Sequence, residues 1–359
     1  MKPYMLTHYG NPSSIHAHGR QSRSAIEQAR KKVADLLNTS PAEIFFTSGG
    51  TEADNTAIIC TLESGNFRHA ITSKIEHHAV LHTLQYLEKK GKIAISYVNL
   101  DQNGSISFDH LQELLASNGP SLVSLMHANN EIGNITDIKK VGEICSEHQS
   151  VFHSDTVQAV AHYVHNLQEI DVHCMVGSAH KFHGPKGVGF LYIKSDHKIC
   201  PLVHGGGQER NMRGGTENVI GIVGLAKALE IAYEHMKTHH QHIQGLKTHM
   251  IEQLKLKIPE VMFNGLSDCP DPSLYTVLNV SLPPSDDNEM LLFNLDISGI
   301  SASGGSACTS GSNIGSHVLT ELGADPKRGS VRFSFSKFNT LEEVDYTVQK
   351  VAKLFQVKA

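Results

Sequence analysis

The sequence lacks the features that mark membrane, secreted or nucleic-acid-binding proteins. No apolar run approaches the roughly 18 residues needed to span a bilayer, and the first residues do not open a signal peptide. The formal net charge of −5 leaves no basic excess for nucleic acid. The six cysteines show no CxxC pair and no regular spacing, and five of them read as buried or incidental thiols. We therefore expect a cytoplasmic protein that contacts neither membrane nor nucleic acid.

What is present indicates a two-domain α/β chain. At 359 residues the chain exceeds one compact core, and its 40% apolar and 19% charged content is ordinary. Alternating patterns predict a parallel sheet covered by helices on both faces, with ligands gathered at the carboxyl ends of its strands. The strands are expected at 43–47, 69–73, 93–98, 121–126, 151–154, 172–176 and 188–193, and the helices at 48–62, 77–90, 108–117 and 137–148.

The last third of the chain changes character. A long helical pattern over 219–256 is expected to link two domains. Beyond it, a small α/β domain is predicted from strands at 276–282 and 331–335 and helices at 287–297 and 340–355. The expected division is a short N-terminal segment, a large domain and a small domain, at 1–10, 11–236 and 237–359.

Lys181 stands at the end of a predicted core strand, in Ser178-Ala179-His180-Lys181. A charged, unpaired lysine is costly in a core, so one reading places its ammonium in solvent. The other reading is a nucleophilic amine that forms a Schiff base with pyridoxal phosphate. The four residues alone do not decide between them.

Polar side chains also follow three other predicted strands, which would bring them to the same edge of the sheet. Asp155 could be the buried carboxylate that keeps a pyridine nitrogen protonated, and His77 could stack on the ring. Asn130 and Gln158 could hydrogen-bond the ring oxygen. Each of the four could instead cap a turn or a helix.

A phosphate site is indicated where a strand runs into Ser48-Gly49-Gly50-Thr51 and a helix begins. The spacing fits neither a Walker loop nor a dinucleotide fingerprint, and a capping turn alone explains it about as well. Gly50, Thr51, Ser178 and His180 would hold the phosphate. The loop 205–218, with its glycines and arginines, has similar anion-binding chemistry unless it is a plain surface loop.

Cys308 lies in a small, polar segment, Ser301–Ser312, which is unlike core. A thiol in such a loop could act as a nucleophile, although a chance cysteine in a linker is the alternative. Arg332 follows on a strand, where its guanidinium could bind a substrate carboxylate. No metal site is expected, because the helical cluster His239-His240-His242 has no carboxylate or thiol partner nearby.

Six segments together resemble a cysteine desulfurase of the NifS/IscS type. That family belongs to the class V aminotransferases and to fold type I of the pyridoxal phosphate enzymes. The resemblance covers nearly the whole chain in the expected order, and the long loop around Cys308 resembles the first group of these enzymes. The segments are Thr47-Ser48-Gly49-Gly50-Thr51-Glu52, Met126-His127-Ala128-Asn129-Asn130-Glu131-Ile132-Gly133, Asp155-Thr156-Val157-Gln158, Ser178-Ala179-His180-Lys181, Arg213-Gly214-Gly215-Thr216 and Ser306-Ala307-Cys308-Thr309-Ser310.

The resemblance implies that L-cysteine is converted to L-alanine while its sulfur passes to Cys308 as a persulfide. Lys181 would hold the cofactor and move protons, and His77 would help to shuttle them. Asn11, Asn130 and Arg332 would bind the substrate.

The resemblance also implies partners. Thr216 would reach the phosphate of a neighbouring subunit, which implies a homodimer. The sulfur would go to an acceptor protein for iron–sulfur cluster assembly or tRNA thiolation, with Cys308 at most a transient cluster ligand.

One departure from the family keeps an alternative open. Members usually carry an Asp-x-Ala-Ala-Thr-Thr segment before the motif that begins here at Gly10, and Met1 stands only nine residues before Gly10. The alternative is a selenocysteine lyase or another class V pyridoxal phosphate enzyme, or a catalytically impaired homologue.

Overall fold

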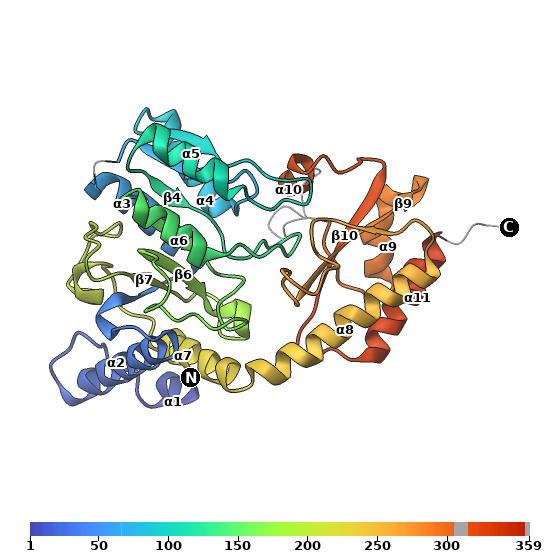
Figure 1. Ribbon diagram of the computed structural model, residues 1–359. Helices are drawn as coiled ribbons and strands as arrows, with labels where there is room; N and C mark the ends of the chain where they lie inside the picture. Colours follow the sequence, from blue (N-terminus) through green and yellow to red (C-terminus); the bar gives the residue numbers. More distant parts are fainter. Residues whose placement is uncertain (66, 305–314, 356–359) are drawn as a thin grey trace. The chain divides into compact units, whose positions relative to one another are not determined.

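The computed structural model describes residues 1–65, 67–304 and 315–355, which form two units (Figure 1). The first unit comprises Met1–Asn99, Ser107–His127 and Asp137–Met236. The second unit comprises Leu100–Ile106, Ala128–Thr136 and Lys237–Ala359. Each unit contains its own β-sheet together with helices, so the predicted α/β class is confirmed.

The sheet of the first unit has seven strands in the order β1-β7-β6-β5-β4-β2-β3. All neighbours from β3 to β6 are parallel, whereas β7 runs antiparallel to both β6 and β1. The connection from β6 to β7 is too short for a helical crossover, which needs about a dozen residues or more, so the chain turns back. The mostly parallel sheet expected from the sequence is thus confirmed. Its strands are β1 Ile44–Thr47, β2 His69–Thr72, β3 Ala94–Tyr97, β4 Leu122–Ser124, β5 Val151–Asp155, β6 Cys174–Ser178 and β7 Gly189–Ile193.

Helix α3 (Gly50–Gly65) is the helix that matters most for the site. Its Ala53 and Ala57 are buried against β6 and β7, and Ile58 and Leu62 are buried in a second cluster with α4 and β2. Burial on several sides fixes its axis, and its first turn meets the strand ends. The other helices of this unit are α1 Lys2–Leu6, α2 Ala17–Leu37, α4 His78–Lys89, α5 Phe108–Asn118, α6 Ile138–Glu147 and α7 Val219–Glu234, with short 3-10 helices η1 Pro41–Glu43, η2 Ala179–Phe182 and η3 Gln208–Asn211.

The uninterrupted helix expected over 219–256 is wrong, because the chain forms two helices there, α7 and α8 (Met236–Lys257). The break is at His235, whose backbone leaves the helical region at φ −108° and ψ 10°. Neither proline nor glycine stands next to it, so the sequence carries no local signal for the break. The other predicted helices and strands agree with the structure to within a few residues.

The second unit is built on an antiparallel sheet with the order β10-β9-β8. Along β10, Val331 and Phe333 point into the core, and Arg332 between them faces the other side. The valines of α11 at 344, 348 and 351 form its buried stripe. The elements are β8 Met262–Phe263, β9 Val277–Pro284, β10 Arg328–Ser334, η4 Asp286–Met290, α9 Leu291–Ile297, α10 His317–Glu321 and α11 Leu341–Phe355.

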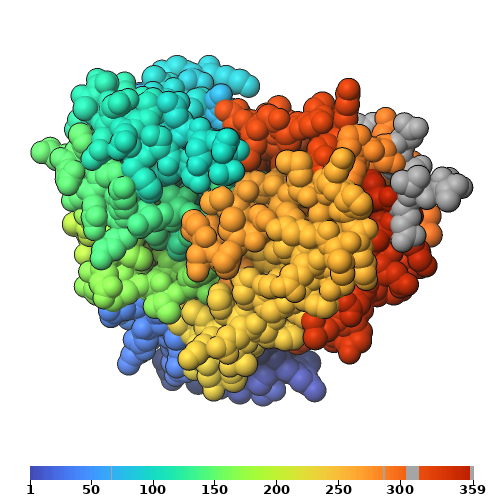
Figure 2. All heavy atoms as spheres, turned by 45° about the vertical axis from the view of Figure 1, so that its right-hand side comes forward, coloured from blue at the N-terminus to red at the C-terminus, as the bar shows by residue number. Residues whose placement is uncertain are grey.

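Helix α8 covers one side of this second unit, and Figure 2 shows its yellow-to-orange atoms at the surface. It buries Leu246, Met250 and Leu254, which recur at helical spacing, while its opposite face is rich in lysine and histidine. Among the residues described, no helix combines the length and the apolar character needed to cross a membrane.

Candidate active site

The centre of the candidate site lies at the carboxyl ends of β5 and β6 in the first unit. Asp155 is the last residue of β5, and Ser178 is the last residue of β6. Lys181 follows within η2, half-buried, directly after the strand. Because β5 and β6 are parallel neighbours, their ends lie side by side. The strand-end rule therefore brings together the lysine and the carboxylate that the sequence singled out.

Asp155 is a carboxylate with little access to water, being 6% exposed. Its Oδ1 accepts the backbone N–H of Val157 at 2.9 Å. Burial raises the pKa of Asp155, while His77, that N–H group and Lys181 act in the opposite direction. A buried carboxylate of this kind is well suited to hold a protonated nitrogen of a ligand.

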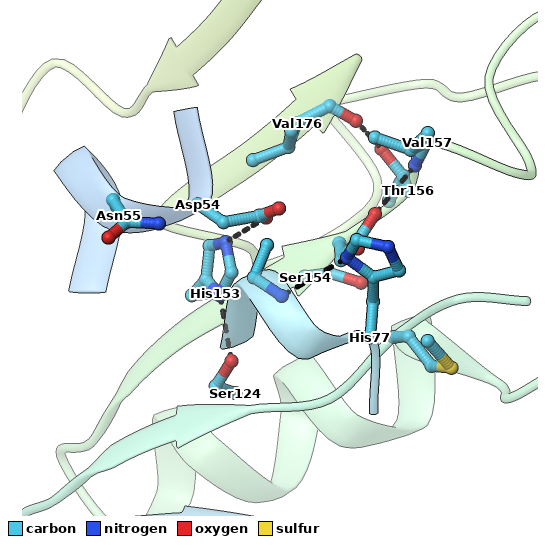
Figure 3. Close-up of polar contacts among 12 residues, drawn as sticks. Asp54, Asn55, His77, Ser124, His153, Ser154, Thr156, Val157 and Val176 are labelled. Atoms are coloured by element: carbon cyan, nitrogen blue, oxygen red, sulfur yellow. Dashed lines mark hydrogen bonds and ion pairs between the residues drawn. The ribbon is translucent and has the colours of Figure 1, made fainter. Parts of the chain in front are cut away.

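His77 is the N-cap residue of α4, which was the second of the two roles predicted for it from the sequence. Its Nδ1 accepts the N–H of Ala79 at 3.1 Å, so Nδ1 carries no proton in this arrangement. The ring proton then lies on Nε2, which leaves a defined donor on the other side of the ring. Figure 3 shows the His77 ring near the turn that follows β5, formed by Thr156 and Val157. Capping and a catalytic role are therefore compatible for this histidine.

The phosphate end of the candidate site is formed where α3 begins. Gly50 is the first residue of this 16-residue helix, so free N–H groups point outward from its first turn. A side chain at Gly50 would bring its Cβ to 2.8 Å from Val157 Cγ2, so the helix start lies against the turn after β5. Ser178 Oγ and His180 Nδ1 are 3.0 Å apart, and both groups can face an anion. Thr51 next to Gly50 is exposed.

The glycine-rich loop of the first unit is anchored by ion pairs that the sequence reading missed. Arg213 forms a bidentate ion pair with Glu52 in the first turn of α3, with 2.9 Å from Nε to Oε1 and 3.2 Å from Nη2 to Oε2. Thr216 is exposed three residues further on, in a pocket that also includes Ser48 and Gly187. The loop is thus tied to the helix whose start forms the phosphate end.

The predicted substrate residues Asn130 and Arg332 both belong to the second unit. Arg332 Nη1 donates to the carbonyl oxygen of Asn130 at 2.8 Å. The Asn129 side chain shapes this turn by accepting the N–H groups of two later residues. On its strand, Arg332 also pairs through its backbone with Ser303, at the start of the cysteine segment.

For three other predicted site residues, the structure describes no contact with the residues named above. Asn11, in the first unit, is exposed, and its side chain accepts the N–H of Ser13. Gln158 is half-buried in the turn after β5. Cys308 lies outside the described residues.

The remaining thiols differ from the one predicted to react. Cys60, Cys145 and Cys174 are buried, and burial raises the pKa of each thiol, that of Cys174 to about 12. Cys200 and Cys269 are half-buried and free. In the part of the chain that the structure describes, no three His, Cys, Asp or Glu side chains are grouped as metal ligands.

Sequence reasoning also missed a buried pair next to Asp155, formed by Asp54 of α3 and His153 of β5. Figure 3 shows the two side chains pointing toward one another, with Ser124 on the far side of the imidazole. Two signals could have found the pair. Asp54 is a carboxylate one helical turn before the apolar Ala57 and Ile58. His153 precedes Asp155 by two residues, which places both on one face of a strand.

The residues present fit pyridoxal phosphate. A lysine amine, a buried carboxylate at the neighbouring strand end and a helix N-terminus with a serine and a histidine are the groups needed for its aldehyde, its ring nitrogen and its phosphate. The absence of a side chain at Gly50 lets the helix start pack closely against Val157 and the end of β6.

Comparison with known proteins gives consistent matches over nearly the whole chain. Residues 1–347 match the family described as aminotransferase class-V. A cysteine desulfurase IscS of Clostridium botulinum is 42% identical over 364 residues, which cover 99% of this chain and 90% of the relative. A solved NifS-like protein has a TM-score of 0.89 at 37% identity, covering 98% of this chain and 93% of that one. A solved structure described as SspA in complex with cysteine has a TM-score of 0.77 at 32% identity, covering 94% of each chain. The resemblance and the fold type inferred from the sequence are confirmed.

Proposed function

This chain belongs to the class V aminotransferase family and, within it, to the cysteine desulfurases, and we propose that it carries pyridoxal phosphate on Lys181 and sulfur on Cys308. The names of its relatives favour a desulfurase over the selenocysteine lyase alternative. The observation that supports this proposal best is the placement of Lys181 and the buried Asp155 at the ends of adjacent strands.

The cofactor, when bound, supplies an electron sink for the bonds broken at the substrate carbons. Lys181 would hold it through its amine and would move protons to and from the substrate. Asp155 holds the proton of the ring nitrogen, and Gln158 donates toward the ring oxygen. The start of α3 at Gly50 and Thr51 binds the phosphate together with Ser178 and His180, as the geometry of these groups allows.

The substrate is held and cleaved by residues from three segments. Arg332 and Asn130 orient the carboxylate of L-cysteine, with Asn11 as a further contact. His77 keeps its proton on Nε2 because Nδ1 caps a helix, so it is the donor near the ring. The Cys308 thiolate bonds to the substrate sulfur as the Cβ–S bond breaks. The electron pair of that bond stays with the carbon, which is then protonated to give L-alanine.

Assembly and delivery complete the proposal. Thr216, exposed on its loop, contacts the phosphate bound in a second copy of the chain, which makes the protein a homodimer with shared sites. The persulfide passes its sulfur to an acceptor protein, either an iron–sulfur scaffold or a tRNA-thiolation protein. A cytoplasmic location stays a prediction from the sequence.

The proposal is tested by measuring alanine and sulfide formed from L-cysteine and a thiol reductant, with and without added pyridoxal phosphate. The natural chain should produce both, Lys181→Ala should produce neither, and Cys308→Ala should lose the desulfuration while it still binds the cofactor. Cys200→Ser, a change at a half-buried free thiol, is the matched control and should stay active. Desulfuration at the natural rate by Cys308→Ala would contradict the thiol assignment.

A further inference from the structure

Asp54 and His153 form a pair that is closed off from water. Asp54 is 1% exposed and His153 is 0% exposed. His153 Nε2 lies 3.4 Å from Asp54 Oδ1, and His153 Nδ1 lies 2.8 Å from Ser124 Oγ (Figure 3). Within the described structure, neither Asp54 Oδ1 nor His153 Nε2 has a hydrogen-bond partner outside this pair.

Such a pair is stable only with a proton between its two members. Without it, a buried carboxylate would stand beside a neutral imidazole and carry an uncompensated charge. Burial raises the pKa of Asp54 well above its ordinary value and lowers the pKa of His153 to about 3. The raised pKa of Asp54 and the lowered pKa of His153 both mean that burial disfavours a charge on either residue alone. One proton held by the pair leaves its net charge at zero whether the proton sits on oxygen or on nitrogen.

The pair adjoins Asp155. His153 and Asp155 are alternate residues of β5, so their side chains leave the same face of the strand. Asp54 faces both Asp155 and Glu76, and the negative charge of each further raises its pKa. From the other elements, His77 of α4 and Lys181 of η2 face Asp155 with the opposite effect. The electrostatic surroundings of Asp155 thus include His77 and Lys181, and the carboxyl group of Asp54 from the pair.

Resting on the function proposed above, we propose that Asp54 and His153 share one proton and act as positioning residues that keep Asp155 ionised for the ring nitrogen of the cofactor. When Asp155 becomes charged, the proton moves from the Asp54 carboxyl to His153 Nε2. The Nδ1–H of His153 then donates to Ser124 Oγ. No charge enters or leaves the pair, and no co-reactant is needed. A shared proton responds to the field of Asp155 in a way that a fixed hydrogen bond cannot.

This role makes a specific prediction about ligands. Pyridoxal phosphate should gain affinity from the pair, because its ring nitrogen meets Asp155. The 1-deaza analogue, in which a C–H group replaces that nitrogen, should gain none. A role of Asp54 in merely holding α3 in place would instead affect both ligands through the phosphate.

The experiment is a fluorescence titration of the cofactor-free protein with pyridoxal phosphate and with its 1-deaza analogue. Asp54→Asn and His153→Gln should each weaken pyridoxal phosphate binding by about tenfold, the factor that corresponds to one pKa unit. Binding of the deaza analogue should stay within about twofold, the usual limit of independence between sites. The double variant should be no weaker than either single variant, because each one already abolishes the sharing of the proton.

Ser154→Ala is the matched control, since Ser154 is buried on the opposite face of β5 and donates to the carbonyl oxygen of Leu125. It should not change the ratio of the two affinities. Equal losses for both ligands, additive losses in the double variant or no loss at all would each overturn the inference. If the natural chain bound no pyridoxal phosphate, the proposed function itself would fail, which is a different result from unchanged ratios in a chain that binds it.

Discussion

Arg30 of α2 and Glu209 of the glycine-rich loop form a buried bidentate ion pair, with 2.7 Å from Nη1 to Oε2 and 2.8 Å from Nη2 to Oε1. Both side chains are 3% exposed. Glu209 also accepts the N–H of Phe46 on β1. It does so from a backbone at φ 44°, a region that residues other than glycine rarely adopt. The pair thus fixes the start of the loop that presents Thr216.

Replacing Glu209 by Gln should destabilise the first unit, because the buried Arg30 guanidinium then keeps only the exposed Glu27 as its counter-charge. Breaking a buried pair from one side costs about 3–5 kcal/mol. We expect a clear fall in the thermal unfolding midpoint, measured by circular dichroism. Glu230→Gln is the control, since it removes only exposed pairs with lysines and should leave the midpoint nearly unchanged. Equal falls in the unfolding midpoint of the two variants would show that the buried pair stabilises the protein no more than the exposed pairs do.

The buried thiols should resist alkylation in the folded protein. Cys60, Cys145 and Cys174 are inaccessible, and their raised pKa values leave almost no thiolate near neutral pH. Iodoacetamide should modify them only after unfolding in urea, as measured by peptide mass spectrometry. Loss of desulfurase activity in the folded protein should follow the modification of Cys308. Inactivation that follows modification of Cys200 or Cys269 instead would contradict the predicted nucleophile.

The parts of the site that the sequence predicted share a local cause. Lys181 and Asp155 each follow a recognisable strand, and parallel strands bring their carboxyl ends to one edge. The contacts that could not be predicted from the sequence join residues that lie far apart in the chain. Glu209 could not be assigned to Arg30, because nothing near either residue specifies the other. His153 reads as an ordinary strand residue until α3 places Asp54 opposite it.

Lys247 should make stability depend on pH. It is fully buried in the second unit, where its Nζ donates to Ser273 Oγ and to the carbonyl oxygen of Leu274. Burial lowers its pKa to about 8, below the value of about 10.4 in an unfolded chain. Below about pH 8 both states hold the proton, so the cost of burying the charge is felt in full. Between the two values the unfolded state holds more protons, and stability should rise with pH by at most about 1.4 kcal/mol per unit.

Lys247→Met should remove this rise, as measured by urea unfolding over that pH window. Lys257→Met, at an exposed position of the same helix, is the control and should keep the rise. A free-energy difference between the two variants that does not change with pH would rule out titration of Lys247 as the cause.

Arg332→Lys should weaken the binding of L-cysteine more than it slows the reaction. Lysine keeps the charge but cannot donate to a carboxylate with two parallel N–H groups while also reaching the Asn130 carbonyl oxygen. We expect KM to rise by about tenfold, as loss of a charge-assisted hydrogen bond of about 1.5 kcal/mol would produce, with a smaller change in kcat.

Arg328→Lys is the matched control for this change, because Arg328 lies on the same strand and donates to Ser281 and to the carbonyl oxygen of Glu260. That variant should lose some stability but keep its KM, since its contacts are structural. A fall in kcat with an unchanged KM in Arg332→Lys would mean that the guanidinium acts only in the transition state. It would then be a catalytic group, and recognition of the substrate carboxylate would have to come from another residue.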